Sequence, residues 1–257
     1  MTVNIYDGFN VLLRDTNKLM HGRMSLRQRY EFIRRSNEMN IFVWDGAKHN
    51  ERRREIYPRY KMQRTPIAED VFSQIKLFRE ILTHTHAHQV ECAGWEADDV
   101  ISTLARSFAH KGMNVEVQSN DLDYAQLQSH YLITINGITK SPCEARLIPI
   151  YKALVGDSAD NIAGIPGFGD KAWEAMLPHV DDIEDFVRMK NQASLLALPF
   201  TPRVLNWLKL PENIETLNNM YKIVHFYHVD DFDINNGISR GTPNHEAALA
   251  LFKRFML

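Results

Sequence analysis

Short apolar runs alternate with longer amphipathic stretches through the first half of the chain. Three of the runs have the composition of buried strands, and an aspartate follows each of them closely. These are residues 3–5 before Asp7, residues 41–44 before Asp45, and residues 115–117 before Asp121. Between them, residues 24–39, 68–83 and 97–110 place apolar side chains at helical spacing. The alternation predicts an α/β fold in which the three aspartates lie in one crevice at the carboxyl ends of the strands.

An acidic cluster brackets the third of these helical stretches. Its members are Glu96, Asp98 and Asp99 at the start of the helix, and Asp121 and Asp123 after the following strand. Five carboxylates in one crevice repel one another unless a cation neutralises them. Oxygen ligands with no nearby His or Cys favour magnesium or manganese over zinc. The alternative is a solvated helix start and a polar turn, which suits each residue singly better than it suits the set.

A second motif, GDSADNIAGIPGFGDKAWEAML at residues 156–177, combines acids with glycines. Asp157 and Asp160 are three residues apart, so one helical turn would present both on one face. The glycines around Pro166 predict a tight turn whose backbone N–H groups can meet a phosphate. From Asp181 onward the pattern is helical, interrupted by prolines, and carries no recognisable chemistry.

Residues 48–64 carry seven bases against two acids, with Tyr57 and Tyr60 among them. Bases interleaved with aromatic rings suit a phosphate backbone and stacked nucleobases, whereas a solvated helix face is the alternative. The alternating His84, His86 and His88 have no further ligand nearby, so a polar loop is favoured over a metal site.

The net charge of −2 is an average over unlike regions. Without nine candidate metal ligands, 30 bases remain against 23 acids, and an acidic pit in a basic surface suits metal-dependent chemistry on a polyanion. The nine are Asp7, Asp45, Glu96, Asp98, Asp99, Asp121, Asp123, Asp157 and Asp160. No apolar run approaches the roughly 18 residues of a membrane helix, and a strand begins almost at Met1, so neither a membrane span nor a signal peptide is expected. Two cysteines without metal-ligand spacing suit a reducing cytoplasm, in a bacterial or phage-infected cell.

With these motifs the chain resembles the flap endonuclease and 5′–3′ exonuclease family, which includes phage 5′-nucleases and the nuclease domain of bacterial DNA polymerase I. The matching segments, in family order, are DGFNVLLR at 7–14, VWDG at 43–46, YPRYKMQR at 57–64, GWEADD at 94–99, SNDLDYAQL at 119–127 and GDSADNIAGIPGFGDKA at 156–172. The resemblance implies a mostly parallel central sheet flanked by helices, a helix–turn–helix-like module that binds duplex DNA, and a helical C-terminal part. It divides the chain into a nuclease core, residues 1–155, and the module with the helical region, residues 156–257.

The resemblance also assigns roles by position. Asp45, Glu96, Asp98 and Asp121 match the ligands of a first metal ion, which Asp7 reaches through water. Asp121, Asp123, Asp157 and Asp160 match a second ion, and Asp99 matches an additional acid. Lys61 and Arg64 match a basic pair at the scissile phosphate, Tyr60 a stacking aromatic, and Arg14 a basic residue near the substrate. Gly164, Gly167, Gly169 and Lys171 match a duplex-binding turn that in this family often holds potassium.

Two features depart from the family's pattern. Ala163 stands where a proline is common, and 35 residues separate Tyr60 from Glu96. This segment is short for a helical arch over the active site, and most of it belongs to the predicted helix at 68–83. We therefore expect a 5′ strand to enter through an open groove.

The expected reaction is hydrolysis of phosphodiester bonds near 5′ ends or flaps of DNA by a monomer that uses two ions of Mg²⁺ or Mn²⁺. Branched, nicked and 5′-ended duplexes are the expected substrates, together with RNA–DNA hybrids in primer removal; no replication-protein partner is identifiable. The alternative is a non-catalytic, structure-specific DNA-binding protein of the same fold, against which the full set of nine acids argues. A hydrolase of small phosphate esters would leave the basic stretch and the glycine turn unexplained.

Overall fold

The computed structural model describes residues 1–16, 24–138, 140–189 and 198–254. The chain forms two compact units. The first, here the sheet unit, comprises Met1–His49, Thr65–Ser141 and Tyr227–Leu257, and the second, here the helical unit, comprises Asn50–Arg64 and Pro142–Phe226. Both units are therefore discontinuous in sequence. The division expected between residues 155 and 156 stays a prediction.

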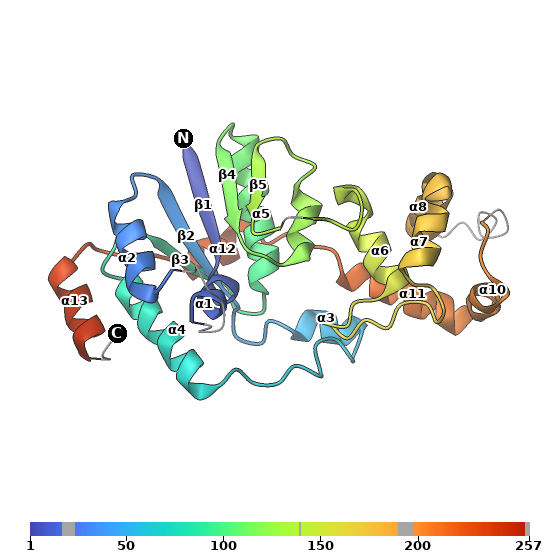
Figure 1. Cartoon of the computed structure of the whole chain (residues 1–257), viewed down its shortest axis with the longest axis horizontal. Coiled ribbons are helices and arrows are strands. Elements are labelled where there is room, and N and C mark those ends of the chain that lie inside the picture. Colours follow the sequence, from blue (N-terminus) through green and yellow to red (C-terminus); the bar gives the residue numbers. More distant parts are fainter. Residues whose placement is uncertain (17–23, 139, 190–197, 255–257) are drawn as a thin grey trace. The chain divides into compact units, whose positions relative to one another are not determined.

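The sheet unit is built on a six-stranded sheet of order β5-β4-β1-β2-β3-β6 (Figure 1). The strands are β1 (Thr2–Asp7), β2 (Met39–Trp44), β3 (His88–Glu91), β4 (Asn114–Gln118), β5 (Ile133–Asn136) and β6 (Ile238–Arg240). All neighbours pair in parallel except β6, which is antiparallel to β3. The mostly parallel α/β architecture expected from the sequence is confirmed.

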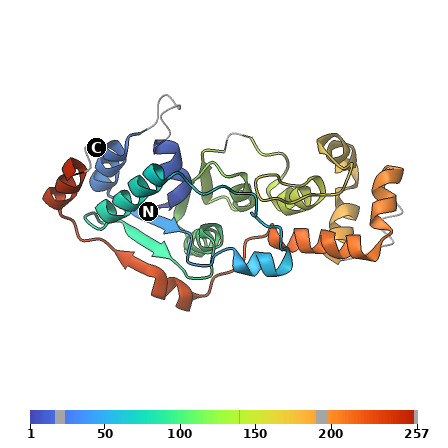
Figure 2. The same cartoon turned by 90° about the horizontal axis from the view of Figure 1, so that it is seen from below.

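Helices cover both faces of this sheet (Figures 1 and 2). One face carries α1 (Gly8–Thr16), α2 (Leu26–Arg35) and α4 (Glu69–Leu82), with α13 (His245–Arg254) packed against α4. The other face carries α5 (Ala97–His110), which packs on β1, β2 and β4, while α12 (Asp231–Gly237) contacts β3. Alternate strand residues such as Tyr6, Phe42 and Trp44 point toward α4 and form the core with Phe78 and Ile81. This alternation follows from the period of two of a β-strand.

The helical unit contains α3 (Glu51–Ile56), η2 (Ala145–Leu147), α6 (Ile148–Val155), α7 (Asp170–Met176), η3 (Leu177–His179), α8 (Val180–Met189), α10 (Pro202–Leu208) and α11 (Pro211–Ile223). Its core includes Leu154, Ile165, Trp173 and Met220. Helices α6 and α7 pack together and are joined by the glycine-rich turn, in which Ile165 N donates to Leu154 O at 2.8 Å. A helix–turn–helix arrangement is thus present at the predicted motif.

Two local expectations were wrong. Asp157 and Asp160 do not share a helical turn; they lie in a short loop closed by a reciprocal bridge, in which the backbone N–H groups of Asp157 and Ile162 each donate to the other's carbonyl at 2.8 Å. His88 does not lie in a polar loop but in β3, where its backbone pairs with Ile41 and Arg240. Among the described residues, no helix combines the length and apolar character that spanning a membrane requires.

Candidate active site

Three adjacent parallel strands each bring an acid to the same edge of the sheet. Strands β4, β1 and β2 are neighbours. Asp7 is the last residue of β1, Asp45 directly follows β2, and Asp121 lies three residues beyond the end of β4. The strand-end acids therefore meet at one edge of the sheet unit, the carboxyl edge where ligands bind in open α/β sheets.

Backbone geometry joins Asp45 to the start of α5. The Ala97 N–H lies in the first turn of α5, where backbone donors have no partner within the helix, and it donates to Asp45 Oδ1 at 2.8 Å. Gly46 follows immediately and passes so close to β3 that a Cβ there would lie 1.8 Å from the Cys92 carbonyl oxygen. Only glycine permits this approach. Glu96 is the N-cap residue of α5 and is 2% exposed.

Tyr124 and Ser119 donate hydrogen bonds to these acids. The Tyr124 hydroxyl lies 2.6 Å from Asp98 Oδ1 and 3.4 Å from Asp7 Oδ2. Ser119 Oγ lies 3.2 Å from Asp7 Oδ2, and it also accepts from the Asp121 N–H at 3.2 Å. These contacts tie β1, α5 and the segment after β4 into one hydrogen-bonded network.

Burial and the neighbouring carboxylates raise the pKa of Asp7. Burial raises the pKa of Asp7 well above its usual value, and the charges of Asp98, Asp45 and Asp121 raise it further, against the lowering effect of the Asn10 N–H. Burial, together with the charges of Asp7 and Asp98, also raises the pKa of Tyr124 well above 10, so its hydroxyl remains a donor. Such mutual repulsion is relieved when a cation occupies the site.

Asp98, Asp121 and Asp123 offer carboxylate oxygens that lie within 4.8 Å of one another. Asp121 Oδ1 accepts from the Asp123 N–H at 3.0 Å, which fixes the turn that presents both side chains. The donor set is composed of hard oxygen atoms, as magnesium and manganese prefer. The residues of this edge therefore fit a divalent metal ion, with Asp7 and Asp45 beside them.

Asp99 has a different position from the other acids of its helix. It is 1% exposed, and its Oδ1 accepts from the backbone N–H of Tyr227 at 2.8 Å. The side chain therefore anchors the returning segment that leads to α12.

In the helical unit, a cluster of two bases meets Asp160. Arg64 pairs with Asp160 Oδ1 at 2.7 Å, and Lys61 Nζ lies 3.9 Å from the same oxygen. Asp160 and Lys61 are each 7% exposed. Two bases against one acid leave this cluster with a net positive charge, and Arg64, the most exposed of the three, is the cation best placed to reach a ligand.

Asp157 pairs with a base that the sequence did not single out. Lys152 Nζ lies 2.6 Å from Asp157 Oδ2, and Lys152 is 9% exposed. Burial alone would raise the pKa of Asp157, but the Lys152 charge and hydrogen bond outweigh it and lower the pKa below its usual value. Asp157 is therefore ionised at neutral pH.

The aromatic rings of the basic stretch serve the core of the helical unit. Tyr57 and Tyr60 are 8% and 3% exposed, and both belong to that core. Lys61 Nζ lies 4.8 Å from the Tyr60 ring centre, and Arg53 donates to the carbonyls of Ile223 and His225. Interleaved bases and aromatics here reflect burial with cation–π contacts, and neither ring is exposed for stacking in this structure.

The glycine turn has the backbone that its sequence demands. Gly164 and Gly167 have φ values of +65° and +89°, in the left-handed region that favours glycine. Gly169 is the N-cap of α7, and a Cβ there would meet no atom within 4 Å. Lys171 is exposed in the first turn of α7, and Arg14, in the last turn of α1, lies beside Gly137 in the sheet unit.

Sequence reasoning missed Tyr124, Ser119 and Lys152 as site residues. Tyr124 follows Asp123 directly, and Ser119 precedes the same acidic turn, so proximity to the motif was the available signal. Lys152 lies in an apolar helix five residues before Asp157, and its single charge among apolar neighbours could have indicated a buried partner.

The chain is similar to known nucleases over most of its length. The sequence profile described as 5′–3′ exonuclease, N-terminal resolvase-like domain, matches residues 15–148. The chain is 32% identical to the 5′–3′ exonuclease of Aquifex aeolicus over 225 residues, which cover 81% of this chain and 71% of that relative. It is 31% identical over 192 residues to the thermostable DNA polymerase I of Thermus thermophilus, covering 67% of this chain and 23% of the polymerase. It thus spans about a quarter of the polymerase relatives.

Two solved structures share the fold. The bacteriophage T5 5′-exonuclease with bound divalent metal ions (zinc) superimposes with a TM-score of 0.59 at 21% identity, covering 87% of this chain and 86% of that one. The catalytic core of Rad2 in complex with a DNA substrate gives a TM-score of 0.57 at 13% identity, covering 98% of this chain and 86% of that one.

Proposed function

This chain belongs to the 5′–3′ exonuclease family, and we propose that it hydrolyses phosphodiester bonds near the 5′ ends and flaps of DNA. The reaction is proposed to occur at the acidic edge, which is the carboxyl edge of the sheet with Asp7, Asp45, Glu96, Asp98, Asp121 and Asp123. The observation that carries the proposal is the convergence of Asp98, Asp121 and Asp123 beside Asp7. A non-catalytic DNA-binding protein of this family would be expected to lack some of the metal-ligating acids. This chain has an acid at each of the nine candidate positions.

Asp98, Asp121 and Asp123 are the residues proposed to hold divalent metal ions, with Asp7, Asp45 and Glu96 supporting them. Bound divalent ions supply an activated water and stabilise the leaving oxygen. We propose Mg²⁺ or Mn²⁺ as the physiological ions, on the basis of the oxygen-only donor set. Asp157 and Asp160 remain proposed ligands of a second ion, and potassium is proposed at the turn of Gly164–Gly169; both proposals rest on the family resemblance.

The other residues position charge and substrate. Tyr124 fixes the orientation of the Asp98 carboxylate through its hydroxyl, and the Ala97 N–H does the same for Asp45. We propose that Lys61 and Arg64 offset negative charge on the reacting phosphate, because they lie in the YPRYKMQR segment that resembles the family and their one acidic partner, Asp160, leaves them a net positive charge. Tyr60 requires a rearrangement of its buried ring to stack on a base, so we propose its role to be support of Lys61.

The substrates proposed are branched, nicked and 5′-ended duplex DNA, with RNA–DNA hybrids as a second class. The glycine turn, Lys171 and Arg14 are the proposed duplex contacts, because backbone N–H groups and exposed bases bind phosphate without reading sequence. The protein is proposed to act as a monomer in the cytoplasm of a bacterial or phage-infected cell.

A cleavage assay tests the proposal. Flap, nicked and blunt duplexes, each labelled at the 5′ strand, are incubated with the protein in Mg²⁺, in Mn²⁺ and in EDTA, and the cut sites are mapped. Cleavage near the 5′ end that requires the metal is expected. Binding of the flap or nicked DNA in preference to the blunt duplex, without cleavage in either metal, would instead identify a structure-specific DNA-binding protein.

A further inference from the structure

Beside the acidic edge, the sheet unit carries an apolar pocket that the proposed chemistry does not use. It has a volume of about 380 Å³ and is lined by Phe9, Phe72, Ile75, Lys76 and Arg79. This volume lies within the range of about 300–1,000 Å³ that is usual for small-ligand sites. The lining combines two aromatic rings with two bases and contains no acid, which is the composition of a site for a base and its phosphates.

Residues that line the pocket are near the acidic edge in sequence. Phe9 is two residues after Asp7, so their Cα atoms are at most about 7 Å apart. Phe9 packs edge-on against Trp44, with ring centres 5.9 Å apart at 86°, and Trp44 directly precedes Asp45. One ring of the pocket therefore lies at the start of α1, directly after the strand that ends at Asp7, and contacts the last residue of the strand that precedes Asp45.

Phe72 is the part of the pocket that is open to solvent. It lies in the first turn of α4, and 50% of the residue is exposed, although a large apolar ring is favoured inside a protein. Lys76 follows it by one helical turn on the same face of α4 and is also exposed. An exposed ring with a base one turn away is suited to stack a nucleobase while the ammonium meets its phosphate.

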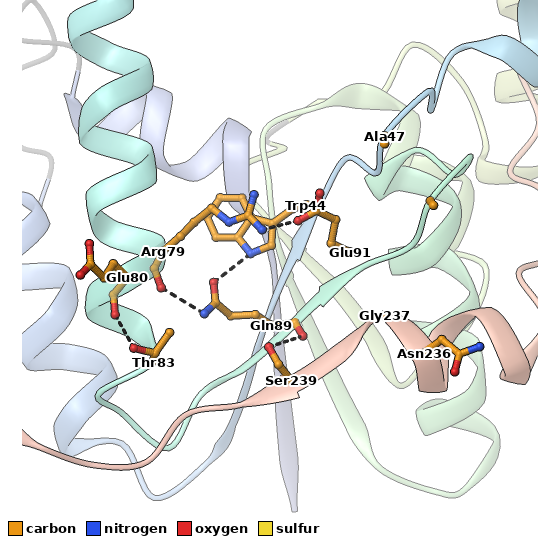
Figure 3. A pocket seen from close by; sticks show the side chains of 11 residues that line it. Trp44, Ala47, Arg79, Glu80, Thr83, Gln89, Glu91, Asn236, Gly237 and Ser239 are labelled. Carbon is orange, nitrogen blue, oxygen red and sulfur yellow. Dashed lines mark hydrogen bonds and ion pairs between the residues drawn. The ribbon is translucent and has the colours of Figure 1, made fainter.

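A neighbouring pocket shows why the ring of Phe72, and not that of Trp44, is available (Figure 3). The Arg79 guanidinium lies 4.8 Å from the Trp44 ring centre and pairs with Glu91. Gln89 accepts from the Trp44 indole N–H at 3.2 Å and donates to the Arg79 carbonyl at 3.1 Å. These contacts cover Trp44, which is fully buried, whereas half of Phe72 is exposed to solvent.

The geometry points to a subsite for one unpaired nucleobase, stacked on Phe72 over Phe9, with the adjoining phosphate beside Lys76. Its occupant is the single-stranded nucleotide of a DNA flap, because an unpaired base can leave the stack and offer its faces to both rings, whereas a terminal base pair exposes one face. The subsite rests on the proposed function and names the part of the substrate that the chain selects. Duplexes without an unpaired 5′ nucleotide do not use it.

The test pairs a change in the protein with a change in the DNA. Phe72→Ala is compared with wild type on a one-nucleotide flap whose unpaired residue carries a base or is abasic. Binding is measured in EDTA, so that no cleavage intervenes, and cleavage is measured in single turnovers with Mg²⁺. Loss of stacking should weaken flap binding roughly 5- to 150-fold. Removal of the base should cost wild type a similar factor and cost Phe72→Ala little.

Matched controls separate stacking from general damage. Phe32→Ala removes a ring of similar exposure, 47%, from α2, which lines neither pocket, and it should bind both flaps as wild type does. Phe72→Trp should restore the preference for the flap base. The subsite would be overturned if removal of the flap base weakened binding by the same factor in wild type and in Phe72→Ala. It would also be overturned if Phe72→Ala bound the intact flap as tightly as wild type does.

The outcomes also separate this inference from the proposed function. Wild-type cleavage of a nicked duplex, which has no unpaired nucleotide, reports on the chemistry alone. If nicked and flap DNA are both left intact, the proposed nuclease function fails. If they are cleaved and Phe72→Ala behaves as wild type on the flap, the nuclease function stands and the subsite is refuted.

Discussion

The Tyr124 hydroxyl lies 2.6 Å from Asp98 Oδ1 and 3.4 Å from Asp7 Oδ2. It carries one proton, so the shorter contact is the donated bond. Burial and the adjacent acids keep the pKa of Tyr124 high, and the phenol stays a donor across the pH range of catalysis. Tyr124 is therefore a positioning residue for Asp98.

Replacing this phenol should weaken metal binding without unfolding the protein. Tyr124→Phe keeps the ring and removes the hydroxyl, so Asp98 loses the donor that fixes its orientation. We expect a 10- to 100-fold loss, roughly, in apparent metal affinity or single-turnover rate. The measurement is the cleavage rate as a function of Mg²⁺ concentration, with Tyr131→Phe as the control, because Tyr131 is 89% exposed. An unchanged metal dependence would reduce Tyr124 to a packing residue.

Asp121→Asn should abolish cleavage and spare DNA binding. Asp121 lies beside Asp98 and Asp123, and the amide removes one negative charge from the set that is proposed to hold the cation. A rate lower by several orders of magnitude is expected in single turnovers, while binding to a nicked duplex stays within a few-fold. Asp70→Asn, in the first turn of α4, is the charge-matched control. Near-normal turnover by a folded Asp121→Asn protein would refute the metal site.

Lys61→Ala should slow the chemical step more than it weakens binding. The ammonium is buried beside Asp160 and Tyr60, where low polarity strengthens its field. A cation that acts mainly in the transition state affects the rate more than the affinity. Single-turnover rates and equilibrium binding of one flap substrate are compared, with the exposed Arg59→Ala as the control. Equal losses in both quantities would make Lys61 an ordinary phosphate contact.

A bulky 5′ cap should leave cleavage largely intact. Residues 60–96 are all described, and they contain α4, β3 and turns, with no helix between Lys61 and Ala68 that could form an arch. We therefore expect a strand to enter from the side. The rate on a 5′-biotinylated flap is measured with and without streptavidin added before the protein. Complete protection by streptavidin would show that the free end must pass through an opening.

The stability of the protein should fall as the pH drops from about 7 toward 5, in part because of His88. Burial, and then the charge of Arg240, lowers the pKa of His88 below its usual value, and its buried Nδ1 has no hydrogen-bond partner among the described residues. The unfolded chain therefore binds the proton more tightly, so stability rises with pH through this window and levels off above it.

Urea unfolding at pH 7.5 and at pH 5.5 measures this effect. His88→Gln should show a smaller loss of stability between the two pH values than wild type does. His86→Gln, exposed and two residues away, should show the wild-type loss. If His88→Gln loses as much stability as wild type on acidification, other groups account for the dependence.

The sequence predicted the acids of the site better than their partners. Asp7, Asp45 and Asp121 each follow a short apolar run, and parallel pairing brings such positions together wherever the runs become neighbouring strands. Tyr124 had no equivalent signal, because its contact with Asp7 spans 117 residues and depends on the packing of α5 and η1. Hydrophobic periodicity indicates which face of a helix or strand is buried, but it does not identify the distant residues that a side chain contacts.

Other failures came from reading short polar segments as surface. Tyr57 and Tyr60 lie among so many bases that exposure was the natural interpretation, yet both rings are core residues of the helical unit. Asp157 and Asp160 have helical spacing, but the bridge between Asp157 and Ile162 holds them in a loop. In each segment, contacts with distant or bridging residues outweighed local propensity.

The sheet that carries the acidic edge is completed only when β6, near the end of the chain, pairs with β3. Strands β1 to β5 are complete by Asn136, but β3 keeps an open edge until Ile238–Arg240 emerges, after the whole of residues 142–226 has been synthesised. An unpaired edge is a template for association with other chains. A nascent chain that stalls within the helical unit would therefore expose this strand edge while already carrying Asp7, Asp45 and Asp121, so the time spent on the ribosome is when the protein is most prone to associate with other chains.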